Sequence, residues 1–325
     1  MTWDKKKRLS GRFISILALI IMLCSTGPSY ADSSETVYHE TEEEAAAELR
    51  EQMLKRKTKV TVGFKAEPDQ DELKAMIGRL VDEATEHTGN PDEGDYITFQ
   101  YESFKGMAQT GALDYEPVVT IEYDLSYYDN KRQEKEADKK ANEIIESLEL
   151  EDKTDYEKIQ SIYDYICDNV DYEPAEDGDN INRTAYGALV GGKAVCQGYT
   201  VALYKLLLME GIDNRIIFGK GVSPEGKKSP HTWNIVRLED KYYYIDPTWG
   251  DTADRKEYFL VPAGAGFEDA HIADEEFADE SFTEKYPMAE EKYSPERSAF
   301  MQRAASLASR IAAGIHNIFV NDEDQ

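Results

Sequence analysis

An apolar segment that begins at a cysteine and ends at a glycine places the strongest constraint on the fold of this chain. The run Val201–Glu210 (VALYKLLLME) is predominantly apolar, and Gly211 follows it at the position where helices commonly end. The pattern predicts a buried helix with Cys196 at or just before its first residue. The unpaired N–H groups and the positive dipole end of a helix stabilise a thiolate, which lowers the pKa of a cysteine from its free value of about 8.5. Cys196 is therefore a candidate nucleophile.

Three strands are predicted downstream of this helix. Their residues are 214–219, 231–238 and 241–246, and residues 220–230 are interpreted as a flexible loop. Consecutive strands joined by short turns pair in an antiparallel sheet. The nucleophile helix is thus expected to pack on such a sheet.

The turn between the last two strands decides whether His231 and Asp246 can meet. A two-residue turn at 239–240 pairs Leu238 with Lys241. In this register His231 and Asp246 are diagonal neighbours on one face, about 7–8 Å apart at the backbone, which allows an imidazole–carboxylate hydrogen bond. A turn with an odd number of residues would place them on opposite faces.

Each of the three residues also has a simpler interpretation. A cysteine at a helix start is often only packed, a strand histidine is often a satisfied polar group, and Asp246 before Pro247 can be a turn former. The chain order Cys196, His231, Asp246, together with the matching face, favours nucleophilic acyl transfer, because a thiolate needs a proton carrier and a group that orients it.

Four segments around these residues resemble the transglutaminase-like superfamily of papain-like cysteine enzymes. They are Thr184–Leu189, Ala194–Tyr199 (AVCQGY), His231–Val236 (HTWNIV) and Tyr244–Trp249 (YIDPTW). The appearance is closest to secreted transglutaminase-like domain proteins of Gram-positive bacteria. The resemblance implies an α+β fold with a papain-like core, in which the nucleophile at a helix N-terminus packs on an antiparallel sheet. It also implies that Cys196 is the nucleophile, His231 the general acid/base and Asp246 its orienting partner.

The chemistry that this resemblance implies is acyl transfer at an amide of a protein or peptide, through a thioester intermediate. The second nucleophile can be water, which gives a protease or peptidase, or a lysine amine, which gives a crosslink to a glutamine side chain. A catalytically silent surface module that retains the fold is the alternative. We expect no cofactor and no metal, because residues 177–180 (DGDN) lack the spacing and the closing glutamate of an EF-hand loop. The oxyanion is expected to bind the Cys196 N–H and one unidentified side chain.

Residues 1–31 have the layout of a secretory signal. Five basic residues precede an apolar run of about a dozen residues, and small residues stand before a cleavage point after Ala31. An uncleaved anchor is the alternative, although the run is shorter than the roughly twenty residues of a membrane-spanning helix. Cys24 lacks the small neighbours of a lipidation site. The expected location is therefore extracellular or at the cell surface.

The remaining chain divides into three predicted parts: 32–152, 153–292 and 293–325. The first contains a surface helix or helical linker and a small α+β domain of unknown role, in which alternating apolar residues predict strands around Val60, Ile97–Tyr101 and Val119–Tyr127. The second is the catalytic domain, and the third is an amphipathic helix. Cys167, on a helix of the catalytic domain, is expected to be a packed thiol.

The composition limits the partners of the chain. It carries 37 basic and 65 acidic residues and a net charge of −28, a field that repels phosphate backbones and anionic lipids. Removal of 1–31 takes away five basic residues and one acidic residue and brings the charge to −32. We expect no nucleic-acid partner, and membrane contact only through the signal or, in one interpretation of 293–325, the C-terminal helix. The sequence does not determine the oligomeric state.

Overall fold

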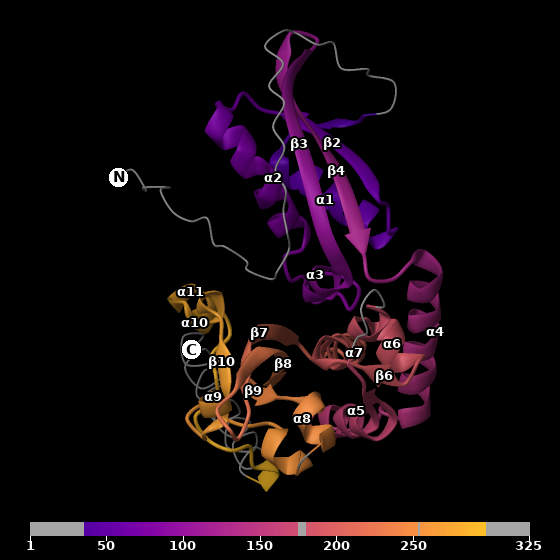
Figure 1. The fold of residues 1–325 in the computed structure, drawn as a ribbon, viewed down its shortest axis with the longest axis vertical. Helices are drawn as coiled ribbons and strands as arrows, with labels where there is room; N and C mark the ends of the chain where they lie inside the picture. Colours follow the sequence, from indigo (N-terminus) through magenta and orange to yellow (C-terminus); the bar gives the residue numbers. More distant parts are fainter. Residues whose placement is uncertain (1–35, 175–179, 253, 297–325) are drawn as a thin grey trace, which may run out of the picture.

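The computed structural model describes residues 36–174, 180–252 and 254–296. The first part of the chain forms a four-stranded sheet in the order β1-β2-β4-β3, against which two helices pack (Figure 1). Its elements are β1 (Tyr38–His39), α1 (Glu42–Leu54), β2 (Lys59–Lys65), α2 (Gln70–Ala84), α3 (Asp95–Gln100), β3 (Tyr101–Leu113) and β4 (Glu116–Tyr127). Apolar side chains of α1, α2 and the sheet share one core, which a continuous antiparallel β2-β4-β3 ladder supports.

Two expectations for this part need correction. Helix α1 is more than a surface helix, because Ala45, Leu49 and Met53 on one of its faces are buried in the core. The strand expected over Ile97–Tyr101 is wrong up to residue 100, where the chain forms α3 instead. All residues of α3 are buried, including its polar ones. The sequence therefore shows no exposed polar face that would distinguish a helix from a strand.

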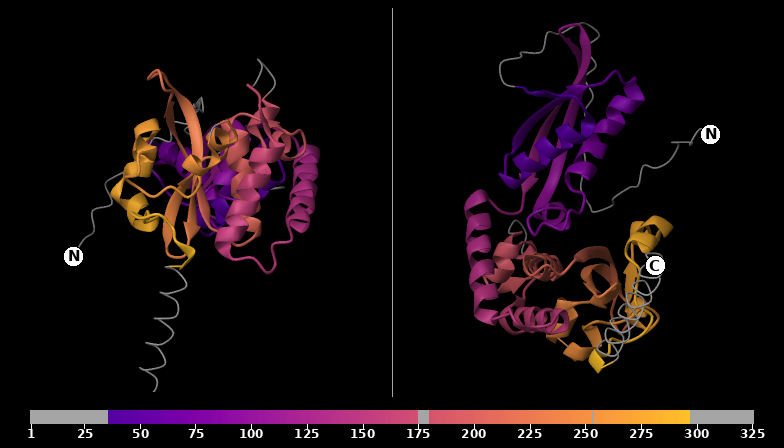
Figure 2. Two further views of the ribbon diagram at one scale, coloured as in Figure 1. Left: turned by 90° about the horizontal axis from the view of Figure 1, so that it is seen from below. Right: turned by 180° about the vertical axis from the view of Figure 1, so that it is seen from behind.

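The second part of the chain contains a four-stranded sheet in the order β10-β7-β8-β9, with helices on both sides of it (Figures 1 and 2). Its helices are α4 (Lys131–Leu148), α5 (Asp155–Asn169), η1 (Ile181–Arg183), α6 (Ala185–Leu189), α7 (Cys196–Met209), α8 (Pro247–Thr252), η2 (Arg255–Tyr258), α9 (Phe267–Ala270), α10 (Glu275–Ala278) and α11 (Glu280–Lys285). Its strands are β5 (Asp171–Tyr172), β6 (Lys193–Ala194), β7 (Asn214–Val222), β8 (Lys228–Leu238), β9 (Lys241–Ile245) and β10 (His271–Ala273).

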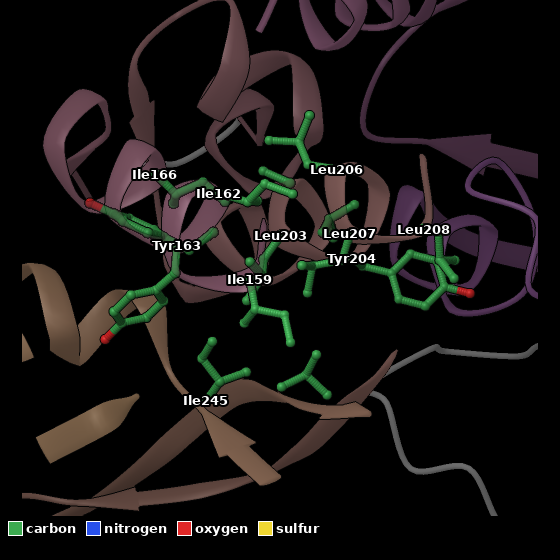
Figure 3. Packing of buried hydrophobic residues seen from close by; sticks show 14 of the residues in the cluster. Ile159, Ile162, Tyr163, Ile166, Leu203, Tyr204, Leu206, Leu207, Leu208 and Ile245 are labelled. Atoms are coloured by element: carbon green, nitrogen blue, oxygen red, sulfur yellow. The ribbon is translucent and has the colours of Figure 1, made fainter. Parts of the chain in front are cut away.

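Helix α7 is the centre of the larger core. Its residues from Gly198 to Leu208 are all buried, and Figure 3 shows its leucines between helix α5 and Ile245 of β9. The helix ends before Gly211, whose φ of 75° lies in the left-handed region that glycine adopts without strain. The predicted buried helix with a glycine end is therefore confirmed.

The β8–β9 hairpin has the predicted register. Leu238 pairs with Lys241, and the two-residue turn places Glu239 at a φ of 61°. The loop expected at 220–230 is shorter than predicted, because β7 and β8 continue to pair as far as Val222 and Lys228. The first three residues of β8 are all exposed. Apolar and polar residues therefore do not alternate there as they would in a half-buried strand.

The described residues thus combine helices and sheets in an α+β fold with a nucleophile helix packed on an antiparallel sheet, as expected. Within them, no helix has the length and apolar character needed to cross a bilayer. The predicted signal at 1–31 lies outside the described residues. So does the predicted C-terminal helix, 293–325, from residue 297 onward. The division at 152 and 292 stays a prediction, although side chains from α3 and α4 pack in the same core as α7.

Candidate active site

Cys196 is the first residue of α7, and backbone contacts fix its position. The preceding Val195 is the N-cap in an extended conformation, and its N–H donates to the carbonyl of Asn182 at 2.9 Å. A Cβ at Gly198 would lie 2.5 Å from the same carbonyl oxygen, so only glycine permits this close approach. Because no side chain caps α7, the start of the helix is left to stabilise negative charge on the sulfur.

His231 and Asp246 meet as the strand register predicts. His231 Nε2 lies 2.7 Å from Asp246 Oδ2, and both side chains are buried. The Cys196 thiol is hydrogen-bonded to the same imidazole. The three predicted site residues are therefore connected through His231, from the start of α7 across β8 to the end of β9.

Asp246 also organises the chain that follows it. Its Oδ1 accepts the backbone N–H groups of Thr248 at 2.9 Å and Trp249 at 3.2 Å, which are in the first turn of α8. The contacts of Asp246 therefore fit both interpretations, as a turn former and as the partner that orients His231. The two oxygens of one carboxylate serve different partners, so the backbone fixes the orientation in which Asp246 faces His231.

The electrostatics of the site favour a charged Cys196–His231 pair. Burial raises the pKa of Cys196, but the hydrogen bond and charge of His231, together with hydrogen bonds from Thr232, bring it below its ordinary value. Burial opposes a charge on His231, yet the Asp246 carboxylate and then the Cys196 sulfur raise the pKa of His231 to about 10. Burial also works against the charge on Asp246, but its two histidine partners hold its pKa well below the usual range. Both shifts favour the thiolate–imidazolium pair over the neutral thiol and imidazole.

His271 is the second histidine partner of Asp246, although from the sequence we expect no acidic or cysteine partner for it at ligand spacing. Its Nε2 lies 2.9 Å from the same Oδ2 that His231 contacts. Strand β10 brings it there by pairing with β7, the neighbour of β8 in the sheet. No local spacing connects residues 246 and 271, so no sequence signal reveals this contact.

Two further neighbours were not singled out from the sequence. The Trp249 ring stacks on the His231 imidazole with ring centroids 5.0 Å apart and planes at 21°. Gly221 lies beside both rings, because a Cβ there would be 3.0 Å from Trp249 and 3.2 Å from His231. The orientation of the imidazole is thus limited on one face by an indole and on one edge by backbone.

Cys167 and His87 have structural environments. Cys167 is buried beside the Pro247 carbonyl, and burial is the main cause that raises the pKa of its thiol to about 12, as expected for a packed cysteine. His87 lies just after α2, where a histidine near a helix C-terminus would be expected to cap it, but its ring does not do so. Its ring contacts the Tyr204 hydroxyl at 2.9 Å and the Asp213 carboxylate at 2.7 Å, which ties the segment after α2 to α7 and β7.

Two groups of side chains in the described residues have the composition of metal ligands. The first is His231, Asp246 and His271, whose nitrogen–oxygen separations of 2.7 and 2.9 Å are those of hydrogen bonds. Ligands that share a tetrahedral zinc at about 2.0–2.1 Å would stand roughly 3.3 Å apart. The second group is Asp92, Glu134 and Asp138, which surrounds the buried ammonium of Lys205 and so already holds a cation.

Comparisons with known proteins match part of this chain to one family. Residues 141–247 match the family described as the Transglutaminase-like superfamily. The kyphoscoliosis peptidases of Mus musculus and Homo sapiens are 28% and 27% identical in an alignment 132 residues long that covers 37% of this chain. The chain spans about a fifth of the length of these curated relatives, 20% in each case.

Two solved structures are similar to parts of this chain. One, described as a TGase, has a TM-score of 0.32 at 14% identity and covers 66% of this chain and 59% of its own. The periplasmic domain of TgpA from Pseudomonas aeruginosa has a TM-score of 0.29 at 15% identity and covers 50% and 67%. By the family match, the segment 141–247 is similar to domains of the Transglutaminase-like superfamily.

Proposed function

We propose that this protein is a secreted thiol enzyme that transfers acyl groups from an amide of a protein or peptide. The observation that carries the proposal is the connected path from the buried Asp246 carboxylate through His231 to Cys196 at the start of α7. In this path each group has the neighbour that its role requires: a thiolate at a helix N-terminus, an imidazole that holds a proton, and a fixed carboxylate.

The reaction would proceed in two steps. The Cys196 thiolate attacks the amide carbonyl carbon, and the negative charge moves to the carbonyl oxygen beside the free N–H groups at the start of α7. The tetrahedral intermediate collapses as the C–N bond breaks, and His231 gives its proton to the leaving amine. The acyl group remains as a thioester on Cys196, while neutral His231 becomes the base for the second nucleophile.

The second nucleophile decides the product. Water attacks the thioester to release a carboxylic acid, whereas a lysine amine forms an isopeptide bond. The curated relatives carry the name peptidase, and on that ground we favour hydrolysis. The signal-like residues 1–31 support an extracellular or cell-surface substrate.

The alternative is a catalytically silent surface module that uses the fold for binding. Thiol alkylation over a range of pH separates the two functions. An enzyme is expected to show Cys196 alkylated at least ten times faster than Cys167 at pH 6–7, because the pKa of Cys196 is lowered whereas burial raises that of Cys167 to about 12. Equal rates for the two thiols, with reaction only near pH 9, would favour the silent module.

An activity comparison then separates hydrolysis from crosslinking. Casein cleavage and incorporation of a primary amine into casein are measured side by side with the full chain. The Cys196→Ala variant is the control for both assays, and Cys167→Ala is the matched control that keeps the site. Cleavage without amine incorporation would establish hydrolysis as the main reaction, and the reverse result would establish crosslinking.

A further inference from the structure

The buried His271 has a hydrogen-bond acceptor at each ring nitrogen. Nδ1 faces the carbonyl oxygen of Phe267 at 3.1 Å, and Nε2 faces Asp246 Oδ2 at 2.9 Å. A backbone carbonyl and an ionised carboxylate can only accept hydrogen bonds, so each nitrogen must carry a proton. Only the imidazolium form has two N–H donors. The contacts therefore describe a positively charged histidine.

Aromatic rings enclose this charge. The Phe267 ring is stacked on His271 at 3.7 Å between centroids, and Trp249 and Trp233 follow at 4.3 and 5.0 Å. The side chain has no exposed surface. A cation is stabilised near the faces of aromatic rings, and more so where water is excluded.

The two histidines also share one carboxylate oxygen. His231 and His271 both approach Asp246 Oδ2, and their ring centroids are 5.5 Å apart. Each therefore weakens the attraction of Asp246 for the other, and two positive rings at this distance repel. The strength with which His231 holds its proton depends on the charge of His271.

We propose that His271 is a positively charged positioning residue, which fixes the Asp246 carboxylate and moderates its hold on the proton of His231. The inference rests on the proposed function, because it concerns the proton that His231 gives to the leaving amine. A general acid that is paired too strongly releases its proton slowly, so a second cation on the carboxylate makes His231 a better acid.

Other ionisable groups near His271 act on the same balance. Tyr258 of η2 lies 6.2 Å from it between ring centroids, and Lys256 and Glu257 line the cavity beside it. From the β7 side, Gly221 pairs with His271 and brings no charge. From β8 and α7, the charges are His231 and the Cys196 sulfur behind it. The effect of His271 is therefore expected to act mainly through Asp246.

The protonation state can be measured in the intact protein. Nitrogen-15 NMR of the histidine rings in wild type and in Cys196→Ala, at pH 7, distinguishes an imidazolium from either neutral tautomer. We expect both nitrogens of His271 to be protonated. A neutral His271 in both proteins would overturn the proposal. This measurement requires no catalysis, so it gives an answer whether or not Cys196 is a nucleophile.

Two variants then test the role of the charge. His271→Gln keeps an N–H donor for Asp246 without the charge, and His271→Phe removes both; His39→Gln, in the partly buried pair with Glu48 outside the site, is the control. The pH profile of Cys196 alkylation is expected to show its upper step, where His231 loses its proton, about one pH unit higher in both His271 variants. Wild-type profiles for His271→Gln would show that the hydrogen bond alone matters and would overturn the role of charge. If alkylation of Cys196 never exceeds that of Cys167 even in wild type, the proposed function fails, while the NMR result still decides the state of His271.

Discussion

The carboxylate of Asp95 in α3 binds the guanidinium of Arg215 in β7 through both of its oxygens, at 2.7 and 2.9 Å. One of these oxygens also accepts the backbone N–H of Ile216 at 2.8 Å. Burial raises the pKa of Asp95, but the charge and hydrogen bonds of Arg215 bring it below its ordinary value. This buried pair fastens α3 to the sheet that carries His231.

Removal of one member of this pair is expected to be costly. Asp95→Asn leaves the Arg215 charge buried without a counter-charge, and we expect a loss of about 3–5 kcal/mol in the free energy of unfolding. Urea denaturation at pH 7 measures it. Glu42→Gln, which breaks a pair with the half-exposed Arg79, is the matched control, with an expected loss of at most about 1 kcal/mol. Similar losses in the two variants would contradict a buried, uncompensated charge.

The sequence predicted the Cys–His–Asp geometry because two local rules were sufficient. The glycine end and apolar run located α7 with Cys196 at its start, and the parity of a two-residue turn placed His231 and Asp246 on one face. Strand periodicity and turn length are properties of neighbouring residues, so a single sequence contains them.

The contacts that sequence reasoning missed are made by segments distant along the chain. His271 reaches Asp246 only because β10 joins the edge of the sheet at β7. Helix α3 was predicted as a strand because burial on all sides removed the polar face that would have shown its period. Both depend on tertiary packing, which no local pattern records.

A second prediction concerns how stability depends on pH. Between about pH 6.5 and 8.5 the unfolded chain holds a proton on Cys196 and none on His231. We expect the native protein to reverse this where the thiolate–imidazolium pair forms, because the pKa of Cys196 is lowered and that of His231 is raised to about 10. Since both states bind one proton, the pair adds no pH dependence to the free energy of unfolding.

Cys196→Ala is expected to reveal that dependence. Without the thiol, the native proton on His231 has no counterpart in the unfolded chain. A raised folded-state pKa gives stability that is present below the unfolded value and is lost as pH rises, here by up to about 1.4 kcal/mol per pH unit relative to wild type. Urea denaturation at pH 6, 7 and 8 checks it. Cys167→Ala should keep the wild-type slope, and parallel curves for all three proteins would exclude the ion pair.

A third prediction tests the space beside the imidazole. Gly221→Ala would place a methyl group 3.0 Å from Trp249 and 3.2 Å from His231, closer than ordinary contacts. We expect the imidazole to move and the alkylation rate of Cys196 at pH 7 to fall by about tenfold or more, since small misplacements of catalytic groups have large effects. Gly78→Ala, where no atom lies within 4 Å of the added methyl group, is the control and should leave the rate unchanged. An unchanged rate in Gly221→Ala would show that the site has room to adjust.

The last prediction concerns the charge of Asp246. In Asp246→Asn the amide oxygen can still accept the N–H groups of Thr248 and Trp249, so the start of α8 is preserved. The amide nitrogen then faces His231 Nε2 and His271 Nε2, and a donor there requires a lone pair on each ring. His231 would keep its only proton on Nδ1, facing Cys196, and the imidazolium would be lost.

We expect this variant to lose acyl-transfer activity by about 10³–10⁴-fold, with Cys196 alkylated mainly above pH 8. Casein cleavage and the pH profile of alkylation measure the two effects. Asp251→Asn, which alters a carboxylate bonded to Tyr199 outside the site, is the control for the loss of one negative charge. If Asp246→Asn retained rapid alkylation at pH 6–7, the thiolate would owe its stability to the start of α7 and Thr232 rather than to the charged His231.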